Sequence, residues 1–216
     1  AIDGEVEDYA FSITGRGEGS VDSFLRIATG SNGGPTINLG DGFGSSTASV
    51  GDLDGDGVTD LAVGALNDDT GGADSMADRG AVHILFLNSD GTVRLSHKIA
   101  SGMNGGPTLA DGDFFGAAVT SLGDLDGDGV ADLAVGAVGD DAGVSDSDRG
   151  AVHILFLNSD GSVRSSRRIT SKTNGGPALA NLDFFGSSLN SPGDLNGDGV
   201  ADLVVGARGD GDGAVH

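Results

Sequence analysis

A nine-residue acidic segment occurs three times in the chain, and its residue types suit the binding of a metal ion. It reads Asp-Leu-Asp-Gly-Asp-Gly-Val-Ala-Asp at 124–132, and its other copies lie at 52–60 and at 194–202, where Asn196 replaces one Asp. Each copy offers side-chain oxygens at positions 1, 3, 5 and 9, a glycine at position 6, and a valine at position 7 whose backbone carbonyl can point inward. Ca²⁺ binds about six to eight hard oxygen ligands, so the pattern predicts three calcium sites. The predicted ligands are Asp52, Asp54, Asp56, Val58, Asp60, Asp124, Asp126, Asp128, Val130, Asp132, Asp194, Asn196, Asp198, Val200 and Asp202.

The first half of the segment resembles the loop of an EF-hand, but the second half does not. An EF-hand has a bidentate Glu at position 12 and a helix after it. Here position 12 is Val63, Val135 or Val205, inside a short apolar run bounded by glycine, which favours a buried strand. An uncoordinated acidic turn is the alternative, because Asp and Gly are common turn residues. Four carboxylates so close together would repel one another without a cation, which favours the metal.

The acidic segments belong to a longer internal repeat with spacings of 72 and 70 residues. Each repeat contains four strand-like pieces. The first follows a Phe-Gly pair at 43–44, 115–116 or 185–186; the second lies at 60–65, 132–137 or 202–207; the third at 79–87 or 149–157; and the fourth at 92–100 or 162–170. An Asp-Gly pair, typical of hairpin turns, separates the third piece from the fourth. Four antiparallel strands per repeat predict an all-β protein of β-propeller blades, and about three blades make an incomplete propeller, since closed ones have about four to eight.

The combination of Phe-Gly, an Asp-rich loop and Val-Gly-Ala resembles the FG-GAP repeat of integrin α-subunit heads and related bacterial proteins, over nearly all of residues 40–216. The resemblance implies Ca²⁺ in the Asp loops and Phe side chains between neighbouring blades. It divides 20–216 into an orphan strand at 21–29 and blades at about 40–100, 112–170 and 182–216. Residues 4–13 resemble the end of a GEVEDY-type bacterial surface domain, so 1–19 is expected to be the end of that segment and a Gly-rich connector. Within it, 9–13 alternates apolar and polar residues and predicts a strand.

The two ends of the repeat region match complementary parts of a blade. Residues 21–28 match a fourth strand, and 213–216 match the start of a third strand. Unpaired strand edges invite strand addition. Either the chain is a fragment of a larger surface protein with more blades, or copies associate head to tail through their terminal strands. The second arrangement gives a ring or a filament.

The bulk composition excludes several classes of function. A net charge of −22 argues against binding to nucleic acid or to anionic membranes. No apolar run is long enough for a membrane span, and the chain has no cysteine. It begins without Met and without a signal-peptide pattern, which we interpret as a processed or excised piece of a secreted bacterial surface protein.

Three further features of the sequence are candidate sites. Arg208, Gly209 and Asp210 spell a tripeptide that integrins recognise, but they align with a turn of the other repeats. His83, His153 and His216 hold equal places in third strands, and packed, hydrogen-bonded histidines are expected there rather than ligands. The acidic loops 67–78 and 139–148 could bind a partner or be solvated turns.

No catalytic constellation is found, so we expect no enzyme. The sequence favours a calcium-binding extracellular structural or adhesive protein that self-associates. The alternative is a recognition module for a glycan or a protein.

Overall fold

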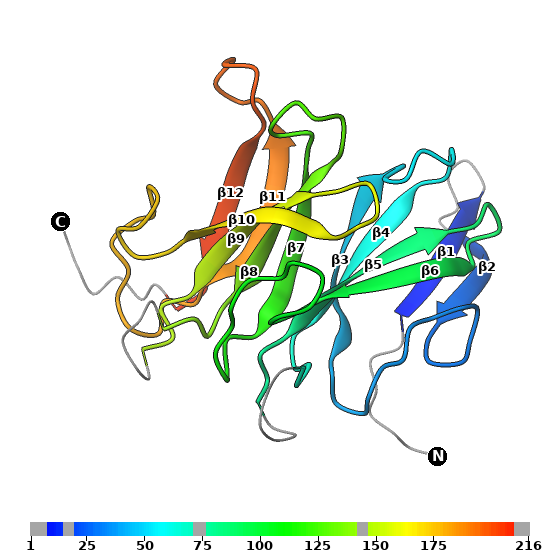
Figure 1. The fold of residues 1–216 in the computed structure, drawn as a ribbon, viewed down its shortest axis with the longest axis horizontal. Coiled ribbons are helices and arrows are strands. Elements are labelled where there is room, and N and C mark those ends of the chain that lie inside the picture. The colour runs from blue at the N-terminus through cyan, green and yellow to red at the C-terminus, as the bar shows by residue number, and fades with distance from the viewer. Residues whose placement is uncertain (1–7, 15–19, 71–76, 142–146, 210–216) are drawn as a thin grey trace.

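The chain is built entirely of β-strands in the part that the structure describes. The computed structural model describes residues 8–14, 20–70, 77–141 and 147–209 (Figure 1). The strands are β1 (Asp8–Thr14), β2 (Ser20–Ile27), β3 (Phe43–Gly51), β4 (Asp60–Ala65), β5 (Ala81–Leu87), β6 (Val93–Ile99), β7 (Phe115–Gly123), β8 (Asp132–Ala137), β9 (Ala151–Leu157), β10 (Val163–Ile169), β11 (Phe185–Gly193) and β12 (Asp202–Ala207). These residues form no helix that is long and apolar enough to cross a membrane.

Consecutive strands pair antiparallel and form four sheets. Two sheets have four strands each, in the orders β3-β4-β5-β6 and β7-β8-β9-β10, while β11-β12 and β1-β2 are two-stranded. The four-stranded sheets are the blades expected at about 40–100 and 112–170, and the prediction of an all-β protein with four-stranded antiparallel blades is confirmed. In Figure 1 β1-β2 lies on the right beside the sheet β3-β4-β5-β6, while β7-β8-β9-β10 and β11-β12 overlap on the left.

Apolar side chains fill the spaces between neighbouring sheets. Ala62 and Ile84 of the first four-stranded sheet meet Leu133 and Leu155 of the second in one core. A second core joins β7-β8-β9-β10 to β11-β12, and a third packs Ile27 of β2 against the first four-stranded sheet. The strands β4 and β8 have a core on each face, which explains why their sequences are continuously apolar after the first Asp.

Two glycines meet where adjacent sheets come closest. A methyl group added at Gly64 of β4 would lie 2.1 Å from the carbonyl oxygen of Gly116 of β7. A methyl group added at Gly136 of β8 would likewise lie 2.1 Å from the carbonyl oxygen of Gly186 of β11. Gly116 and Gly186 have φ of 94° and 92°, which disfavours any residue with a Cβ. The Phe-Gly pair therefore sets the close approach of one sheet to the previous one.

The same backbone hydrogen bond also recurs at two sheet boundaries. The amide of Val93 donates to the carbonyl of Asn32 at 2.8 Å, and the amide of Val163 donates to the carbonyl of Asn104 at 2.8 Å. Each Asn lies in the turn after an outer strand, and each Val begins the outer strand of the next sheet. The strand β2 therefore adjoins the first four-stranded sheet as β6 adjoins the second.

The ends of the chain differ from expectation in one respect. The strand expected at 21–29 is not an orphan, because β1 pairs with β2 along its length. The strand predicted at 9–13 is confirmed as β1. Of the blade expected at 182–216, the structure describes β11 and β12, and the third strand expected to begin at 213 lies outside the described residues.

Candidate metal centres

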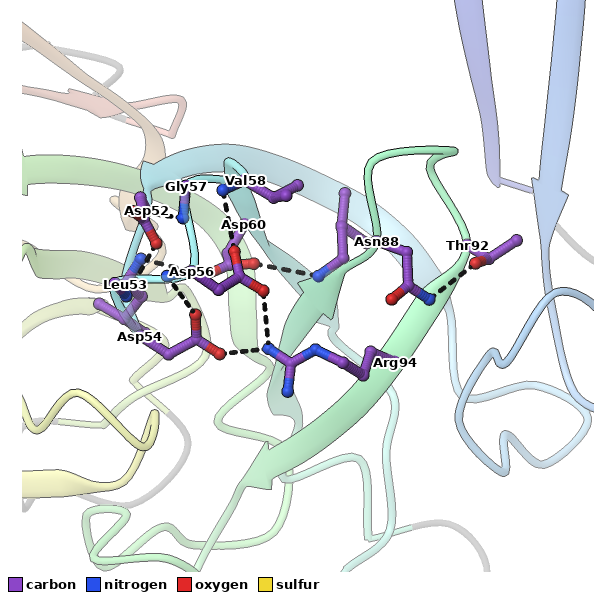
Figure 2. Close-up of polar contacts among 12 residues, drawn as sticks. Asp52, Leu53, Asp54, Asp56, Gly57, Val58, Asp60, Asn88, Thr92 and Arg94 are labelled. Carbon is purple, nitrogen blue, oxygen red and sulfur yellow. Dashed lines mark hydrogen bonds and ion pairs between the residues drawn. The ribbon is translucent and has the colours of Figure 1, made fainter.

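The three acidic segments form the loops between the first and second strands of successive sheets, namely β3-β4, β7-β8 and β11-β12. Position 1 of each loop is an Asp whose carboxylate accepts backbone N–H groups from the turn. Asp52 accepts from Gly55 at 2.8 Å and Gly57 at 2.9 Å, and Asp124 accepts from Gly127 at 2.7 Å and Gly129 at 2.9 Å (Figure 2 shows the first loop). Asp194 makes the corresponding bonds in the third loop. The first acid therefore folds the loop around its own side chain.

These N–H groups also hold the first acid in its charged form. The bond from Gly129, followed by those from Gly127 and Asp128, holds the pKa of Asp124 below its ordinary value despite an opposing desolvation effect. The pKa of Asp194 is lowered for the same reason, with Gly199 as the main donor. An ionised carboxylate at position 1 is what a cation requires.

Position 5 shapes the far side of each loop. Asp56 accepts the amide of Val58 at 2.8 Å, and Asp128 accepts that of Val130 at 2.9 Å. Asp198 does the same for Val200 at 2.9 Å. The backbone carbonyls of the valines at position 7 remain predicted calcium ligands.

In the first two loops, position 9 is a fully buried carboxylate that ties the loop to the sheet, whereas Asp202 of the third loop is half-buried. Asp60 is the first residue of β4, and its two oxygens accept the amides of Leu53 and Leu87, each at 3.0 Å (Figure 2). Asp132 accepts the amides of Leu125 at 3.0 Å and Leu157 at 3.1 Å. Burial raises the pKa of Asp60 and of Asp132, while the amide bonds act in the opposite direction. Each oxygen has a second lone pair that remains able to bind a cation.

Two of the loops bring three carboxylates together in a way that fits a divalent ion. One oxygen each from Asp52, Asp54 and Asp60 lie within 4.8 Å of one another, and so do oxygens of Asp124, Asp126 and Asp128. Oxygen-only donor sets of this kind suit Ca²⁺. In the third loop the amide nitrogen of Asn196 lies 3.3 Å from an oxygen of Asp202, and the Asn196 oxygen accepts the amide of Asp198 at 2.9 Å. The assignment of all fifteen ligands to three ions stays a prediction.

An arginine reaches each of the first two loops from the outer strand of the same sheet, and sequence reasoning missed it. Arg94 of β6 forms an ion pair with Asp54 and lies 3.1 Å from an oxygen of Asp56 (Figure 2). Arg164 of β10 pairs with Asp126 and lies 2.9 Å from an oxygen of Asp128. The recurrence of Arg at 94 and 164, at one position of the repeat, was the available signal.

A second repeated group of acids lies near the Phe-Gly pairs and serves the fold. Asp41 and Asp113 are buried and accept the amides of Asn38 and Ala110, each at 2.8 Å. Desolvation, aided by the charge of Asp140, raises the pKa of Asp113 to about 6. This group was also not anticipated from the sequence.

The buried acids at the start of loops 67–78 and 139–148 have cationic partners. Asp68 forms an ion pair with Lys98, and Asp140 forms one with Arg168. These carboxylates hold each loop to the outer strand of its own sheet.

Two of the three third-strand histidines, His83 and His153, lie in the described part, and they are packed but lack part of the expected hydrogen bonding. His83 and His153 meet the edges of Phe43 and Phe115, with ring centroids 5.3 and 5.5 Å apart. The Nδ1 atoms of both, and Nε2 of His153, have no hydrogen-bond partner. Burial lowers the pKa of each to about 4, so both are neutral near pH 7. His216 and Asp210 lie outside the described residues, while Arg208 stacks over the Phe184 ring at 4.7 Å.

Comparison with known proteins places these loops in a family context. The sequence matches the FG-GAP repeat over residues 43–85, 115–155 and 185–216, which is more than half of the chain. It is 35% identical to human integrin alpha-X over 176 residues, covering 79% of this chain and 13% of that protein. It is 36% identical to integrin alpha-PS5 of Drosophila melanogaster over 174 residues, covering 79% of this chain and 15% of that protein.

The chain thus spans about 13–15% of the length of the curated relatives it matches. The matched residues begin at 43, so the GEVEDY-type interpretation of 1–19 stays a prediction. Sheet order, Phe-Gly contacts and acidic loops all agree with the matched segments, and the chain belongs to the FG-GAP repeat family, whose relatives here include integrin α subunits.

Proposed function

We propose that this chain is a calcium-binding, non-catalytic structural or adhesive module of an extracellular bacterial surface protein. The observation that carries the proposal is the convergence of three carboxylate oxygens within 4.8 Å in each of two loops. Such a cluster is costly at neutral pH because like charges close together repel, and the single arginine beside each loop offsets only part of that charge.

Calcium would act as a structural ion in the loop between the first and second strands of a sheet. Asp52, Asp54 and Asp60 would hold one ion, and Asp124, Asp126 and Asp128 a second. Because position 9 is bonded to the amide of the residue that ends the third strand, fixing the loop would also fix that strand end. At a calcium concentration ten times the dissociation constant, each site would add about 1.4 kcal/mol to the free energy of unfolding.

An extracellular location suits sites of this exposure. Extracellular calcium-binding modules have dissociation constants of about 10⁻⁴–10⁻³ M, because calcium is abundant outside cells. The absence of cysteine leaves calcium as the candidate cross-link, so the stability of the module would follow the calcium concentration.

We propose a supporting rather than a ligand-binding use for the described starts of the loops after the second strands. Asp68 and Asp140 of these loops are committed to ion pairs with Lys98 and Arg168. We therefore favour structural use over recognition of a glycan or another protein. We also propose that copies self-associate through the terminal sheets β1-β2 and β11-β12.

A calcium titration and a melting experiment test the calcium proposal. The melting temperature should fall sharply in excess EDTA and recover with calcium. Asp126→Ala should remove one calcium from the stoichiometry measured by titration calorimetry, whereas Asp160→Ala, which removes an equal charge from the β9-β10 turn, should leave it unchanged. Equal melting temperatures with EDTA and with calcium would refute the proposal.

Self-association is measured separately. Light scattering in calcium buffer should show a mass that rises with protein concentration, and a constant monomer mass would remove this part of the proposal.

A further inference from the structure

The third acidic loop contains an asparagine that is directly followed by a glycine. Asn196 stands where the other two loops have Asp54 and Asp126, and Gly197 comes next. An asparagine before a glycine can lose its side-chain amide without an enzyme, because the glycine nitrogen attacks the side-chain carbon Cγ and ammonia leaves. Glycine favours this attack, since it has no side chain to restrict the backbone. The product would carry a carboxylate at position 3, as the other two loops do.

The structure brings the groups that this reaction needs close together. The amide of Asp198 donates a hydrogen bond to the side-chain oxygen of Asn196 at 2.9 Å, which polarises the Asn196 carbonyl and turns the side chain back along its own backbone. The N–H of Gly197, the attacking nitrogen, donates to the carboxylate of Asp194 at 2.6 Å. A proton acceptor therefore lies within reach of the proton that the attacking nitrogen must lose.

This geometry belongs to the repeated loop and does not depend on the part of the chain beyond β12. In the first loop Asp52 accepts the amide of Gly55 at 2.8 Å, and Asp54 accepts the amide of Asp56 at 3.3 Å. The side chains of Asp54 and Asp126 are 22% and 30% exposed beside the arginines of their outer strands. Water therefore reaches position 3 also where an outer strand is present.

The other three Asn-Gly pairs of the chain, at 32–33, 104–105 and 174–175, are held differently. In each of them the side-chain nitrogen of the asparagine donates to the backbone carbonyl of the residue six positions earlier, at 2.7, 2.8 and 2.7 Å. These bonds hold the amide nitrogen that would have to leave against the end of the preceding strand. The three pairs therefore serve as internal controls for the pair at 196–197.

We propose that Asn196 is a self-modification site, where Gly197 displaces ammonia and an aspartyl residue replaces the asparagine. The Gly197 nitrogen forms a bond to Cγ of Asn196, the bond from Cγ to the amide nitrogen breaks, and Asp194 passes the Gly197 proton to the departing ammonia. One water then opens the cyclic imide. Opening at Cγ restores the main chain with Asp at 196, whereas opening at the backbone carbonyl gives an isoaspartyl linkage.

The consequence for the third loop rests on the proposed calcium binding. An Asp at 196 would give this loop acids at positions 1, 3, 5 and 9, the same set as in the first two loops. Calcium affinity increases with the charge of the ligands, so a carboxylate should bind the ion more tightly than the neutral amide does. The affinity of the third loop for calcium would therefore rise as the protein ages.

Peptide mass spectrometry of the full chain tests the reaction without calcium. The protein is kept folded at neutral pH, digested after increasing times, and each Asn-Gly pair is followed by the mass change from NH₂ to OH. The pair at 196–197 should react faster than the other three by about tenfold or more, because its reacting groups are already positioned. In urea the four rates should converge. Equal rates in the folded chain, or a preference for 196 that persists unchanged in urea, would overturn the proposal.

Two variants examine the roles of the neighbouring groups. Asp194→Asn keeps an oxygen for the Gly197 N–H but no base, so it should lower the rate at 196 to that of the other three pairs. An unchanged rate would overturn the assignment of Asp194 as the proton acceptor. Asn196→Gln has a longer side chain that does not form this imide, and its peptide should keep its mass.

Calcium titration separates the self-modification from the calcium proposal. Asn196→Asp should bind calcium in the third loop about tenfold more tightly than Asn196→Gln does. If the parent chain deamidates at 196 but these two variants bind calcium alike, the modification stands and calcium binding by the third loop is overturned. If Asn196→Asp binds more tightly but the parent chain keeps its mass, the modification is overturned and the calcium proposal stands.

Discussion

Replacing Gly136 by Ala should destabilise the protein because the added methyl group would strike the backbone of the neighbouring sheet. The methyl carbon would lie 2.1 Å from the carbonyl oxygen of Gly186 and 3.0 Å from its carbon. Contacts below 3.0 Å essentially do not occur at Cβ atoms, so the sheets must separate by about 0.9 Å. Overpacking of this kind costs about 1–3 kcal/mol, and a backbone neighbour cannot rotate away.

A matched control exists at the same position of the third repeat. In Gly206→Ala the methyl carbon would meet the hydroxyl of Ser188 at 2.3 Å, and a serine side chain can take another rotamer. Alanine in a strand is otherwise favoured over glycine by about 0.5–1 kcal/mol. We therefore expect Gly136→Ala to lower the free energy of unfolding by about 2 kcal/mol, and Gly206→Ala to change it by less than about 1 kcal/mol.

The assay is thermal and urea unfolding of both variants in saturating calcium, at a dilution where the chain is monomeric. A loss of about 2 kcal/mol should lower the melting temperature by about 4–8 °C in a chain of this size. If the two variants melt together, the close approach of β8 to the Phe-Gly pair does not limit packing, and the account of the sheet interfaces is wrong.

Two further predictions concern charged side chains. Because burial raises the pKa of Asp113 to about 6, the folded state binds its proton more tightly than the unfolded state, and stability should fall as pH rises from about 4 to 6. Asp113→Asn keeps an acceptor for Ala110 and should raise the free energy of unfolding at pH 7 by about 1–3 kcal/mol but little at pH 4; an equal effect at both pH values would contradict this assignment. Arg94→Gln should tighten calcium binding at the first loop, since the guanidinium competes for Asp54, whereas Arg94→Lys should change it less. Weaker binding in Arg94→Gln, measured by calcium titration, would show that the arginine supports the site instead.

The sequence was sufficient to predict the strands and loops because each repeat carries its own local signals. The Asp-Gly pairs, the apolar runs after each acidic loop and the Phe-Gly pairs lie at strand boundaries that the structure confirms within about two residues. Repetition strengthened each assignment, since a chance pattern would not recur in register.

The features that were missed depend on contacts between distant segments. Arg94 contacts Asp54 from 40 residues away along the chain, and it is the residue that the bulge in β6 leaves out of the strand register. The pairing of β1 with β2 was not predicted, because the sequence of β1 does not resemble β5 or β9 and so gave no repeat to align. The packing of His83 and His153 was predicted from the sequence. Their ring nitrogens without hydrogen-bond partners were not, because the groups around a buried side chain are set by the folded structure.

The hydrogen bond that links Asn32 to Val93 and Asn104 to Val163 has a consequence for how such a gene can change. The same backbone hydrogen bond recurs at both junctions between sheets. An in-frame duplication or deletion of about 70 codons would therefore create a junction that contains this bond again. Recombination of this kind would lengthen or shorten the protein in whole units.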